Sequence, residues 1–497
     1  MSIPSQNDSV QLAQNPEHRP LLSLLMTLVL GALAGGMSWG IRGQYGHEVG
    51  AMMFGVLVGF VLVMRHMRDA SSLQVARTVA LFTIAIGFGG SMTYGQTVGL
   101  THDREVHGSA EEPHWNGDAY RWGMVGLATK GGLWIGFGGA FLGMGMSGKT
   151  YRSREMLGIG VGMLFLLFLG KWILNSPFDP EDQRLPVFYF SDHWRWEPEQ
   201  YVKPRPEVWG GLLFAMIGLL AYLQFVKHDR LARNLAFWGI IGGLGFPLGQ
   251  WLQAASIWNP QQYAATSFWK VGINNWNMME VTFGTFAGLA LSFGVWLNKR
   301  SIRSQTTDLV SLSWTSEGWW FYIYVYLLCA GIYFEDTIFE EFYAYGHLMG
   351  IIPMFCIVGG RYWPYLFVFP VIALPLAFKT YRMLCLQIDM IPEPLGMIGI
   401  VTLPLAFLIW VAMNFAEASE RGARCQPFAS RGLLLTSATF FWLNFAFLSF
   451  PWGWWTDWKS MAFQANSGGI YIVGWVVLST AAYAAVARAP KHQVTAD

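Results

Sequence analysis

Long apolar runs recur along the whole chain and constrain its fold more than any other feature. A helix that spans a bilayer needs about 20 mainly apolar residues. Runs of roughly this kind occupy fourteen segments: 21–41, 48–64, 76–98, 122–146, 155–174, 208–226, 235–254, 277–297, 318–334, 345–359, 363–378, 397–415, 433–449 and 470–488. Backbone groups in lipid must be satisfied within the segment, which favours helices. We therefore predict an all-α polytopic integral membrane protein with about 14 transmembrane helices, in a range of 12–14.

The composition agrees with a membrane protein and narrows the partners. Hydrophobic residues make up 53% of the 497 residues and charged residues only 13%, against about 25% charged residues in soluble domains. A net charge of +1 without a basic tract excludes a nucleic-acid partner. The four cysteines show no CxxC spacing, so we expect neither a disulfide framework nor a thiolate metal site. The expected partners are the lipid bilayer and a small-molecule solute, and a homo-oligomer stays open.

Loop charges predict the orientation in the membrane. If the N-terminus is cytoplasmic, every predicted inside loop is basic and most outside loops are acidic, as the positive-inside rule requires. Both termini are then cytoplasmic. Lys379 and Arg382 fall on the outside and are the main exception. We expect the first apolar run to act as an uncleaved span in a bacterial inner membrane.

The same reading divides the chain into five parts. A disordered cytoplasmic tail (1–20) precedes a first bundle of about eight helices (21–297), which carries long outer loops at 99–121 and 175–207. A cytoplasmic linker (298–317) leads to a second bundle of about six helices (318–488) and a short tail (489–497). The segments 345–359 and 363–378 could form one long helix, two helices or a re-entrant pair.

Glycine doublets recur at similar places in four of the predicted helices. They occur at Gly35-Gly36, Gly89-Gly90, Gly131-Gly132 and Gly242-Gly243, and three of them precede a glutamine, namely Gln44, Gln96 or Gln250. Internal repeats with glycine-interrupted helices are typical of many transporters. Small residues that let helices pack closely are the alternative interpretation.

The first outer turn is the most polar stretch of the predicted bundle. It carries Arg42, Gln44, His47 and Glu48 among Gly40, Gly43, Gly46 and Gly50. Glycine permits an unwound backbone, which at membrane depth must line a cavity or be buried in protein. The Arg42 guanidinium could bind a carboxylate, phosphate or sulfate. A tight turn in which Arg42 and Glu48 neutralise each other is the alternative.

Further polar residues lie in the outer halves of other spans. An ionisable residue inside a span is a functional candidate unless it is paired or hydrated. Lys130 lies about eight residues into its helix, where Glu280 or Glu48 could be its partner, and Glu280 follows Asn275. Together with Gln96 and Gln250, these residues predict a polar cavity that opens to the outside. Snorkelling of Lys130 and helix capping by the asparagines are the structural alternatives.

No sequence motif identifies a cofactor, a metal site or a catalytic centre. The chain contains no Walker, dinucleotide-binding, GxSxG or HExxH motif. His102, His107 and His114 do not follow a metal-ligand spacing. We therefore expect neither a cofactor nor a metal ion.

Three classes of function remain. The first is a secondary transporter of a small polar, anionic or sugar-like solute, coupled to protons or another ion, with no enzymatic activity. In this class Arg42 and Lys130 hold the anionic group, and Glu48 or Glu280 carries the proton. The second is a membrane-embedded glycosyl or acyl transferase acting on an outer-leaflet or periplasmic substrate, with His47 or Glu48 as general base. The third is a structural or sensory subunit of a complex. A site near the bilayer midplane would favour the transporter.

Overall fold

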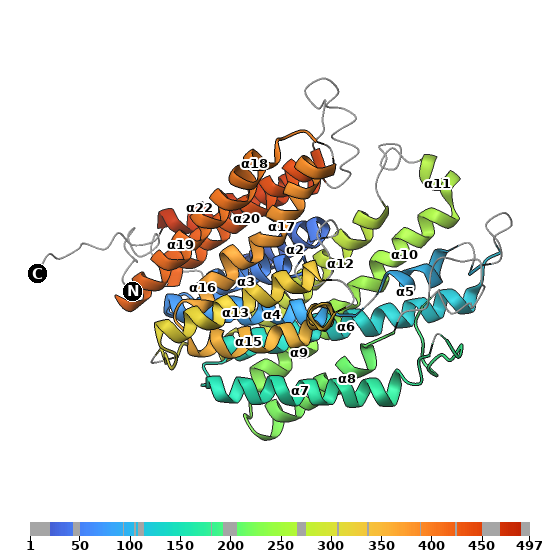
Figure 1. The fold of residues 1–497 in the computed structure, drawn as a ribbon, viewed down its shortest axis with the longest axis horizontal. Helices are drawn as coiled ribbons and strands as arrows, with labels where there is room; N and C mark the ends of the chain where they lie inside the picture. The colour runs from blue at the N-terminus through green and yellow to red at the C-terminus, as the bar shows by residue number, and fades with distance from the viewer. Residues whose placement is uncertain are drawn as a thin grey trace, which may run out of the picture.

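The computed structural model of the chain is built from helices joined by short links (Figure 1). It describes residues 20–42, 50–92, 94–103, 106–107, 114–179, 181–191, 206–265, 275–305, 308–334, 337–387, 389–422, 425–449 and 468–488. Within these ranges helices dominate and there is no β-strand. The predicted all-α class is therefore confirmed.

The first part of the chain forms eleven labelled helices among the described residues. They are α2 (Pro20–Arg42), α3 (Met52–His66), α4 (Ser72–Gly89), α5 (Gly95–His102), α6 (Gly117–Met146), α7 (Ser153–Leu174), α8 (Trp209–Phe225), α9 (Arg230–Gly243), α10 (Gly245–Trp258), α11 (Pro260–Ala265) and α12 (Asn275–Leu297).

The rest of the chain continues after a short 3₁₀ turn, η3 (Lys299–Ser301), and includes three π-helical stretches. Its elements are α13 (Trp314–Tyr333), α14 (Ile338–Ala344), α15 (Gly346–Gly359), α16 (Trp363–Leu366), η4 (Phe367–Val371), α17 (Ile372–Tyr381), η5 (Arg382–Gln387), α18 (Glu393–Gly396), η6 (Met397–Thr402), α19 (Leu403–Glu420), α20 (Cys425–Ser449) and α22 (Gly468–Arg488).

Each of the fourteen predicted segments falls on a helix or an interrupted helix. Among the described residues, eight helical segments are long and apolar enough to cross a membrane, or nine if α14 and α15, which meet at 73°, form one span. The chain is therefore a multi-pass membrane protein, but these criteria do not reach the predicted count of fourteen. One physical reason is length, since α3 has 15 residues and α8 has 17, against about 20 for a full span.

The stretch around residue 360, for which the sequence left three arrangements open, forms separate helices. The helix α15 ends at Gly359, and a second helical run extends from Trp363 to Gln387 through η4, α17 and η5. The predicted segments 345–359 and 363–378 therefore do not form one long helix.

The helices α3 and α4 form the centre of the bundle. Every residue of α4 and every residue of α3 from Met52 to Met64 is buried, as expected for helices that are apolar on all sides. In Figure 1, α3 and α4 lie between α7 and α8 on one edge and α19, α20 and α22 on the other. The helices α20 and α22 pack against α3 and α2, so helices of the predicted second bundle contact the first directly.

Two close helix crossings depend on glycine. A Cβ atom on Gly35 of α2 would overlap the carbonyl oxygen of Gly284 on α12, and one on Gly243 of α9 would overlap the backbone of Gly131 on α6. Small residues allow this approach of two backbones in membrane helices. These glycines therefore serve helix packing, while the internal repeat stays a prediction.

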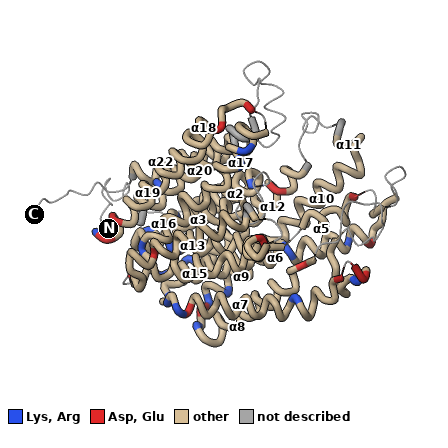
Figure 2. Tube along the Cα trace, in the orientation of Figure 1, with Lys and Arg blue, Asp and Glu red and all other residues tan. Residues whose placement is uncertain are grey.

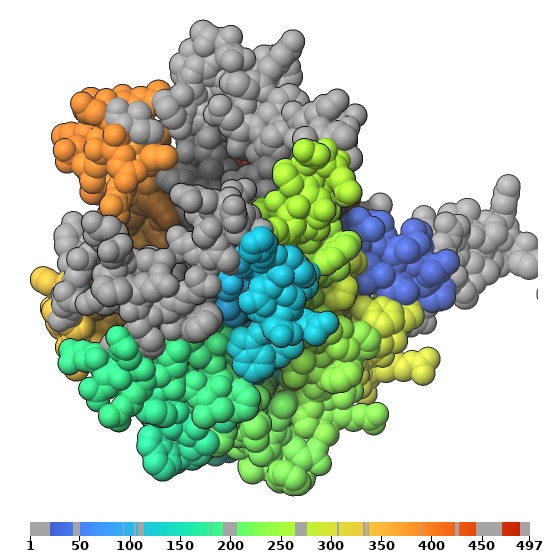
Figure 3. All heavy atoms as spheres, turned by 90° about the vertical axis from the view of Figure 1, so that its right-hand side faces the viewer, coloured from blue at the N-terminus to red at the C-terminus, as the bar shows by residue number. Residues whose placement is uncertain are grey.

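Loops that the sequence places on the same side of the membrane lie at the same end of the molecule. The Gln305 amide donates to the carbonyl of Lys149, and the Lys227 ammonium donates to the carbonyl of Thr150. These contacts join the predicted inside loops at the left-hand end of Figure 1. Figure 2 shows charged residues mainly towards the ends of the helices. Figure 3 looks onto the opposite end, where α5 lies next to α10 and α11.

Candidate functional site

A buried ion pair joins the end of α2 to the beginning of α12. The Arg42 Nη1 lies 2.7 Å from Oε1 of Glu280, and the two side chains are only 1% and 5% exposed. Both terminal nitrogens of Arg42 donate to the Tyr94 hydroxyl, at 2.5 and 2.7 Å. The same hydroxyl donates to Oε1 of Glu280 at 3.2 Å. These three side chains, each in contact with the other two, are named the Arg42 centre below.

The Arg42 centre lies where two helical runs are interrupted. Tyr94 belongs to the link between α4 and α5, and Leu244 separates α9 from α10 in the middle of the 29-residue run Arg230–Trp258. Phe246 follows this second break and packs edge-on against Tyr94, with ring centroids 4.9 Å apart. A run of that length extends about 40 Å. The second break lies at the middle of this run, and the Arg42 centre lies next to it, at the end of α2 and near the beginning of α12.

Aromatic rings enclose the Arg42 guanidinium. Its central carbon lies 5.6 Å from the ring centroid of Trp39, 5.1 Å from that of Tyr94 and 5.6 Å from that of Trp134. Trp39 in turn packs against Trp134 and Phe283, at 5.0 and 4.4 Å between centroids. Cation–π attraction strengthens where water is excluded. The rings therefore stabilise the positive charge independently of Glu280.

A second buried ion pair lies between α6 and the segment before α8. The Lys130 Nζ lies 2.8 Å from Oε1 of Glu207, with exposures of 2% and 1%, and donates to the Thr97 hydroxyl at 2.7 Å. The other carboxylate oxygen of Glu207 accepts from the backbone N–H of Phe190 and from the Trp209 indole, both at 3.0 Å. Both oxygens of this carboxylate are therefore satisfied by protein groups.

A third polar contact joins α10 to α5. The Gln250 amide nitrogen donates to the Thr101 hydroxyl at 2.6 Å and lies 3.4 Å from Nδ1 of His102. The amide oxygens of Gln250 and of Gln96, on α5, are buried and accept no hydrogen bond from a described residue. Each of these two oxygens could accept a hydrogen bond from a water molecule or a solute.

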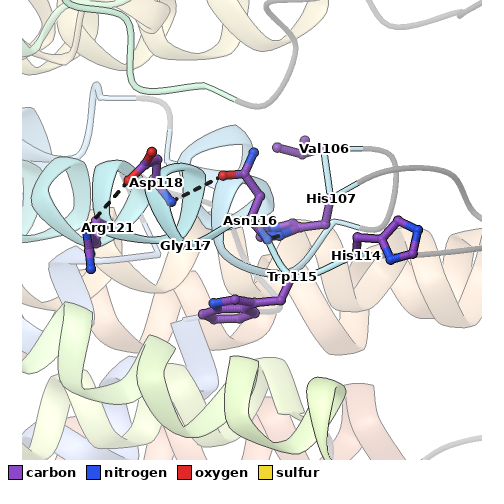
Figure 4. A pocket seen from close by; sticks show the side chains of 8 residues that line it. All are labelled: Val106, His107, His114, Trp115, Asn116, Gly117, Asp118 and Arg121. Atoms are coloured by element: carbon purple, nitrogen blue, oxygen red, sulfur yellow. Dashed lines mark hydrogen bonds and ion pairs between the residues drawn. The ribbon is translucent and has the colours of Figure 1, made fainter.

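An open hollow of about 440 Å³ lies outside the bundle, at the beginning of α6 (Figure 4). His107 is one of the residues that line it, and it accepts from the backbone N–H of Asn116 at 2.8 Å and stacks on Trp115. Its other ring nitrogen lies 3.1 Å from the carbonyl oxygen of Leu100. Since both ring nitrogens have partners within the loop, His107 has a structural role. Among the described residues no group of three or more candidate metal ligands occurs.

The predicted site residues have different positions in the structure. Arg42 and Glu280 meet, whereas Lys130 belongs to the second ion pair, and Gln96 and Gln250 lie at or near the contact between α5 and α10. Gln44, His47 and Glu48 lie in 43–49, outside the described residues, and Asn275 is the first residue of α12. The 440 Å³ hollow contains none of the nine predicted residues.

Two residues at these ion pairs, Glu207 and Tyr94, were not among the predicted site residues. Glu207 is the partner of Lys130, a role for which Glu280 and Glu48 were the predicted candidates. A carboxylate at the end of a long outer loop is normally solvated, so nothing distinguished Glu207 from its neighbours. Tyr94 bridges Arg42 and Glu280. Its place after a glycine doublet, immediately before Gly95, was a usable signal.

The fold and the buried polar contacts define the class of protein: a multi-pass helical membrane protein with two ion pairs inside the part of its bundle that the structure describes. Comparison with known proteins does not narrow this class, because no family model matches the chain and no curated protein matches it.

Proposed function

We propose that this chain is a secondary transporter of a small anionic solute, which binds at the Arg42 centre. The observation that carries the proposal is a buried arginine–glutamate pair beside two interruptions of helical runs, the link between α4 and α5 and Leu244 between α9 and α10. Burying two charges is costly even when they pair, and a bundle of this size does not need such a pair for stability. Broken helices near mid-depth are the usual surroundings of a transported solute.

The chemistry of the Arg42 centre favours an anion. Arginine presents a planar set of donors that matches a carboxylate, phosphate or sulfate group. Glu280 occupies the guanidinium with a carboxylate of the same chemistry, so an incoming anion can take its place. The enclosing rings of Trp39 and Trp134 offer apolar walls for the rest of a small organic anion.

The burial of the Arg42 centre favours transport over an outer-leaflet transferase. An enzyme with a lipid-linked substrate in the outer leaflet needs its reacting groups at the outer surface. The Arg42 centre is instead buried inside the bundle, with Arg42 1% and Glu280 5% exposed. The sequence has no ATP-binding motif, so an ion gradient would supply the energy.

The same proposal includes an orientation and a location. Predicted inside loops, which are basic, contact one another at one end of the bundle. Because of the positive-inside rule, we propose that this end faces the cytoplasm and that the membrane is a bacterial inner membrane. The pocket beside α6 and the long loops then face the outside.

Uptake into proteoliposomes tests this function. The purified protein is offered radiolabelled L-lactate, gluconate, succinate, glutamate, phosphate and sulfate, with glucose as an uncharged comparator. We expect saturable uptake of at least one anion. Arg42→Gln should reduce that uptake about 30-fold, the equivalent of one charge-assisted hydrogen bond of about 2 kcal/mol. Arg42→Lys, which keeps the charge but not the planar donors, should give an intermediate rate.

Arg121→Gln is the matched control, because Arg121 is 82% exposed and pairs only loosely with Asp118. It should transport at the wild-type rate. The proposal fails if no anion of the set is taken up, or if Arg42→Gln, folded by size-exclusion chromatography, transports like the wild type.

A further inference from the structure

We infer that the Arg42 centre carries one proton with each singly charged anion, so that transport moves no net charge across the membrane. This inference rests on the proposed transport function and adds its coupling ion, its stoichiometry and the charge of its substrate. Glu280 is the group that takes the proton, and Arg42 is the group that takes the anion.

The two buried glutamates differ in how fully their oxygens are satisfied. Both oxygens of Glu207 accept hydrogen bonds, from Lys130 on one side and from a backbone N–H and an indole on the other. Only Oε1 of Glu280 does so, while its buried Oε2 accepts no hydrogen bond from a described residue. An unsatisfied, buried carboxylate oxygen is where a proton adds most readily. Glu280 is therefore suited to exchange protons, and Glu207 is suited to stay ionised.

The surroundings of Arg42 allow it to change partners. Its guanidinium keeps contacts with the rings of Trp39, Tyr94 and Trp134 whether or not Glu280 is charged. The Tyr94 hydroxyl accepts from Arg42 and donates to Glu280. When Glu280 is protonated, the same hydroxyl can accept from the acid instead. No covalent bond changes, and only one proton and one anion move.

Few other charges face Glu280. Of the helices packed against α12, α2 contributes the charged residue Arg42. The uncharged residues Phe246 and Gly249 contact α12 from α10, and Gly242 contacts it from α9. Tyr94 faces Glu280 from the link before α5. Two further titratable groups lie close to α2. They are the Tyr471 phenol of α22, beside Gly40, and the Lys379 ammonium of α17, whose charge acts on Arg42. Among described residues, Arg42 is thus the one charged group in contact with Glu280.

The net charge of the Arg42 centre then determines how proton transport is coupled to anion transport. The empty centre holds Arg42⁺ and Glu280⁻ and is neutral. The loaded centre holds Arg42⁺, the anion and protonated Glu280, and is neutral as well. A centre with the proton alone carries +1, and a centre with the anion alone carries −1. An uncompensated buried charge is strongly destabilising. The protein can therefore switch the opening of the site from one side of the membrane to the other only when the centre is empty or fully loaded.

The wild-type protein tests this stoichiometry directly. Proteoliposomes containing a pH-sensitive dye are given radiolabelled L-lactate or gluconate, two singly charged probes. We expect one proton to enter with each anion, and an imposed acid-outside pH gradient to drive accumulation. A membrane potential set with potassium and valinomycin should leave the rate unchanged. Uptake driven by that potential, uptake without protons, or uptake of doubly charged anions alone would overturn the inference but not the proposed function. Absence of any anion uptake would overturn both.

The variant Glu280→Gln gives a second, independent test. Its neutral amide resembles protonated Glu280, so the loaded centre stays neutral while the empty centre carries the unpaired charge of Arg42. We expect exchange of internal for external probe to persist and net accumulation to fall at least tenfold. Net uptake with one proton per anion in Glu280→Gln would contradict the assignment. If Glu280→Gln does not fold, the proton-to-anion ratio of the wild-type protein still tests the inferred stoichiometry.

Glu207→Gln is the matched control for this test. It removes the same charge from the second ion pair, which lies outside the proposed exchange. Whatever uptake this variant retains should keep one proton per anion. Loss of proton coupling in Glu207→Gln would assign the proton to the Lys130 pair and contradict the role of Glu280.

Discussion

Glu280 and Glu207 are chemically identical and almost equally buried, yet their surroundings assign them different roles. Glu207 has a donor for each oxygen, so its carboxylate is fixed in place. Glu280 shares one oxygen between Arg42 and Tyr94 and leaves the other without a described donor. At the scale of single residues, the number of satisfied oxygens therefore separates a structural ion pair from a functional one.

The structural role of the second pair predicts a stability effect. Lys130→Met keeps most of the side-chain volume but leaves Glu207 buried without its partner. The free energy of unfolding should fall by about 3–5 kcal/mol, because an uncompensated charge remains in the bundle. The double variant Lys130→Met/Glu207→Gln should recover much of this loss. Detergent-induced unfolding of the purified protein measures both changes.

An exposed ion pair is the control for that prediction. Arg184 and Asp182 lie 3.1 Å apart with exposures of 62% and 57%, and such pairs contribute little. Arg184→Gln should unfold like the wild type. A Lys130→Met variant as stable as the wild type would show that Glu207 is not held as an ion.

The sequence predicted part of the Arg42 centre. Arg42 and Glu280 could be singled out because charged residues inside apolar segments are rare and costly. Their pairing across more than two hundred residues could not be predicted, since it depends on how α2 crosses α12. Tyr94 and Glu207 were missed because a tyrosine near a helix end and a glutamate in a loop are common in any membrane protein.

At the scale of the helices, glycine contacts place the Arg42 centre. Gly35 and Gly284 let α2 and α12 approach until their backbones touch, which brings Arg42 within reach of Glu280. The predicted segments matched helices because a 20-residue apolar run in lipid has few other ways to satisfy its backbone hydrogen bonds. The break at Leu244 was not predicted, because the apolar pattern of 235–254 continues through it.

This packing predicts the effect of a single methyl group. A Cβ at Gly284 would overlap the backbone of Gly35 and the side chain of Trp39. Gly284→Ala should lower the free energy of unfolding by about 1–3 kcal/mol, and anion uptake should fall with it because Arg42 is displaced. Thermal unfolding and proteoliposome uptake measure the two effects.

Gly158→Ala in α7 is the corresponding control. A Cβ there meets nothing within 4 Å, and alanine is the better helix former by about 1 kcal/mol. Its stability should equal or slightly exceed that of the wild type. Equal stability of the Gly284→Ala and Gly158→Ala variants would show that the crossing of α2 and α12 is looser than described.

At the scale of the whole molecule, the predicted inside and outside loops separate to opposite ends. The contacts of Gln305 with Lys149 and of Lys227 with Thr150 hold one end together. At the other end, the Trp122 indole of α6 donates to the carbonyl of Tyr189 in the second long loop. Loop charge predicted this division because the positive-inside rule depends on the composition of the loops and not on how the helices pack.

Cysteine labelling tests the orientation proposed for these ends. The four native cysteines are replaced by serine, and either Asp118→Cys or Lys149→Cys is introduced, both positions being exposed. A membrane-impermeant maleimide should label Asp118→Cys in intact cells and Lys149→Cys only after permeabilisation. The opposite pattern would invert the proposed topology.

In the proposed transport cycle, an anion replaces Glu280 at Arg42 while Glu280 takes up a proton. Infrared difference spectroscopy of the reconstituted protein, with and without the transported anion, measures this exchange directly. Anion binding should produce the carbonyl band of one protonated carboxylic acid. This band should persist in Glu207→Gln and disappear in Glu280→Gln. An anion-induced spectrum without the band, or a band that survives in Glu280→Gln, would contradict the account.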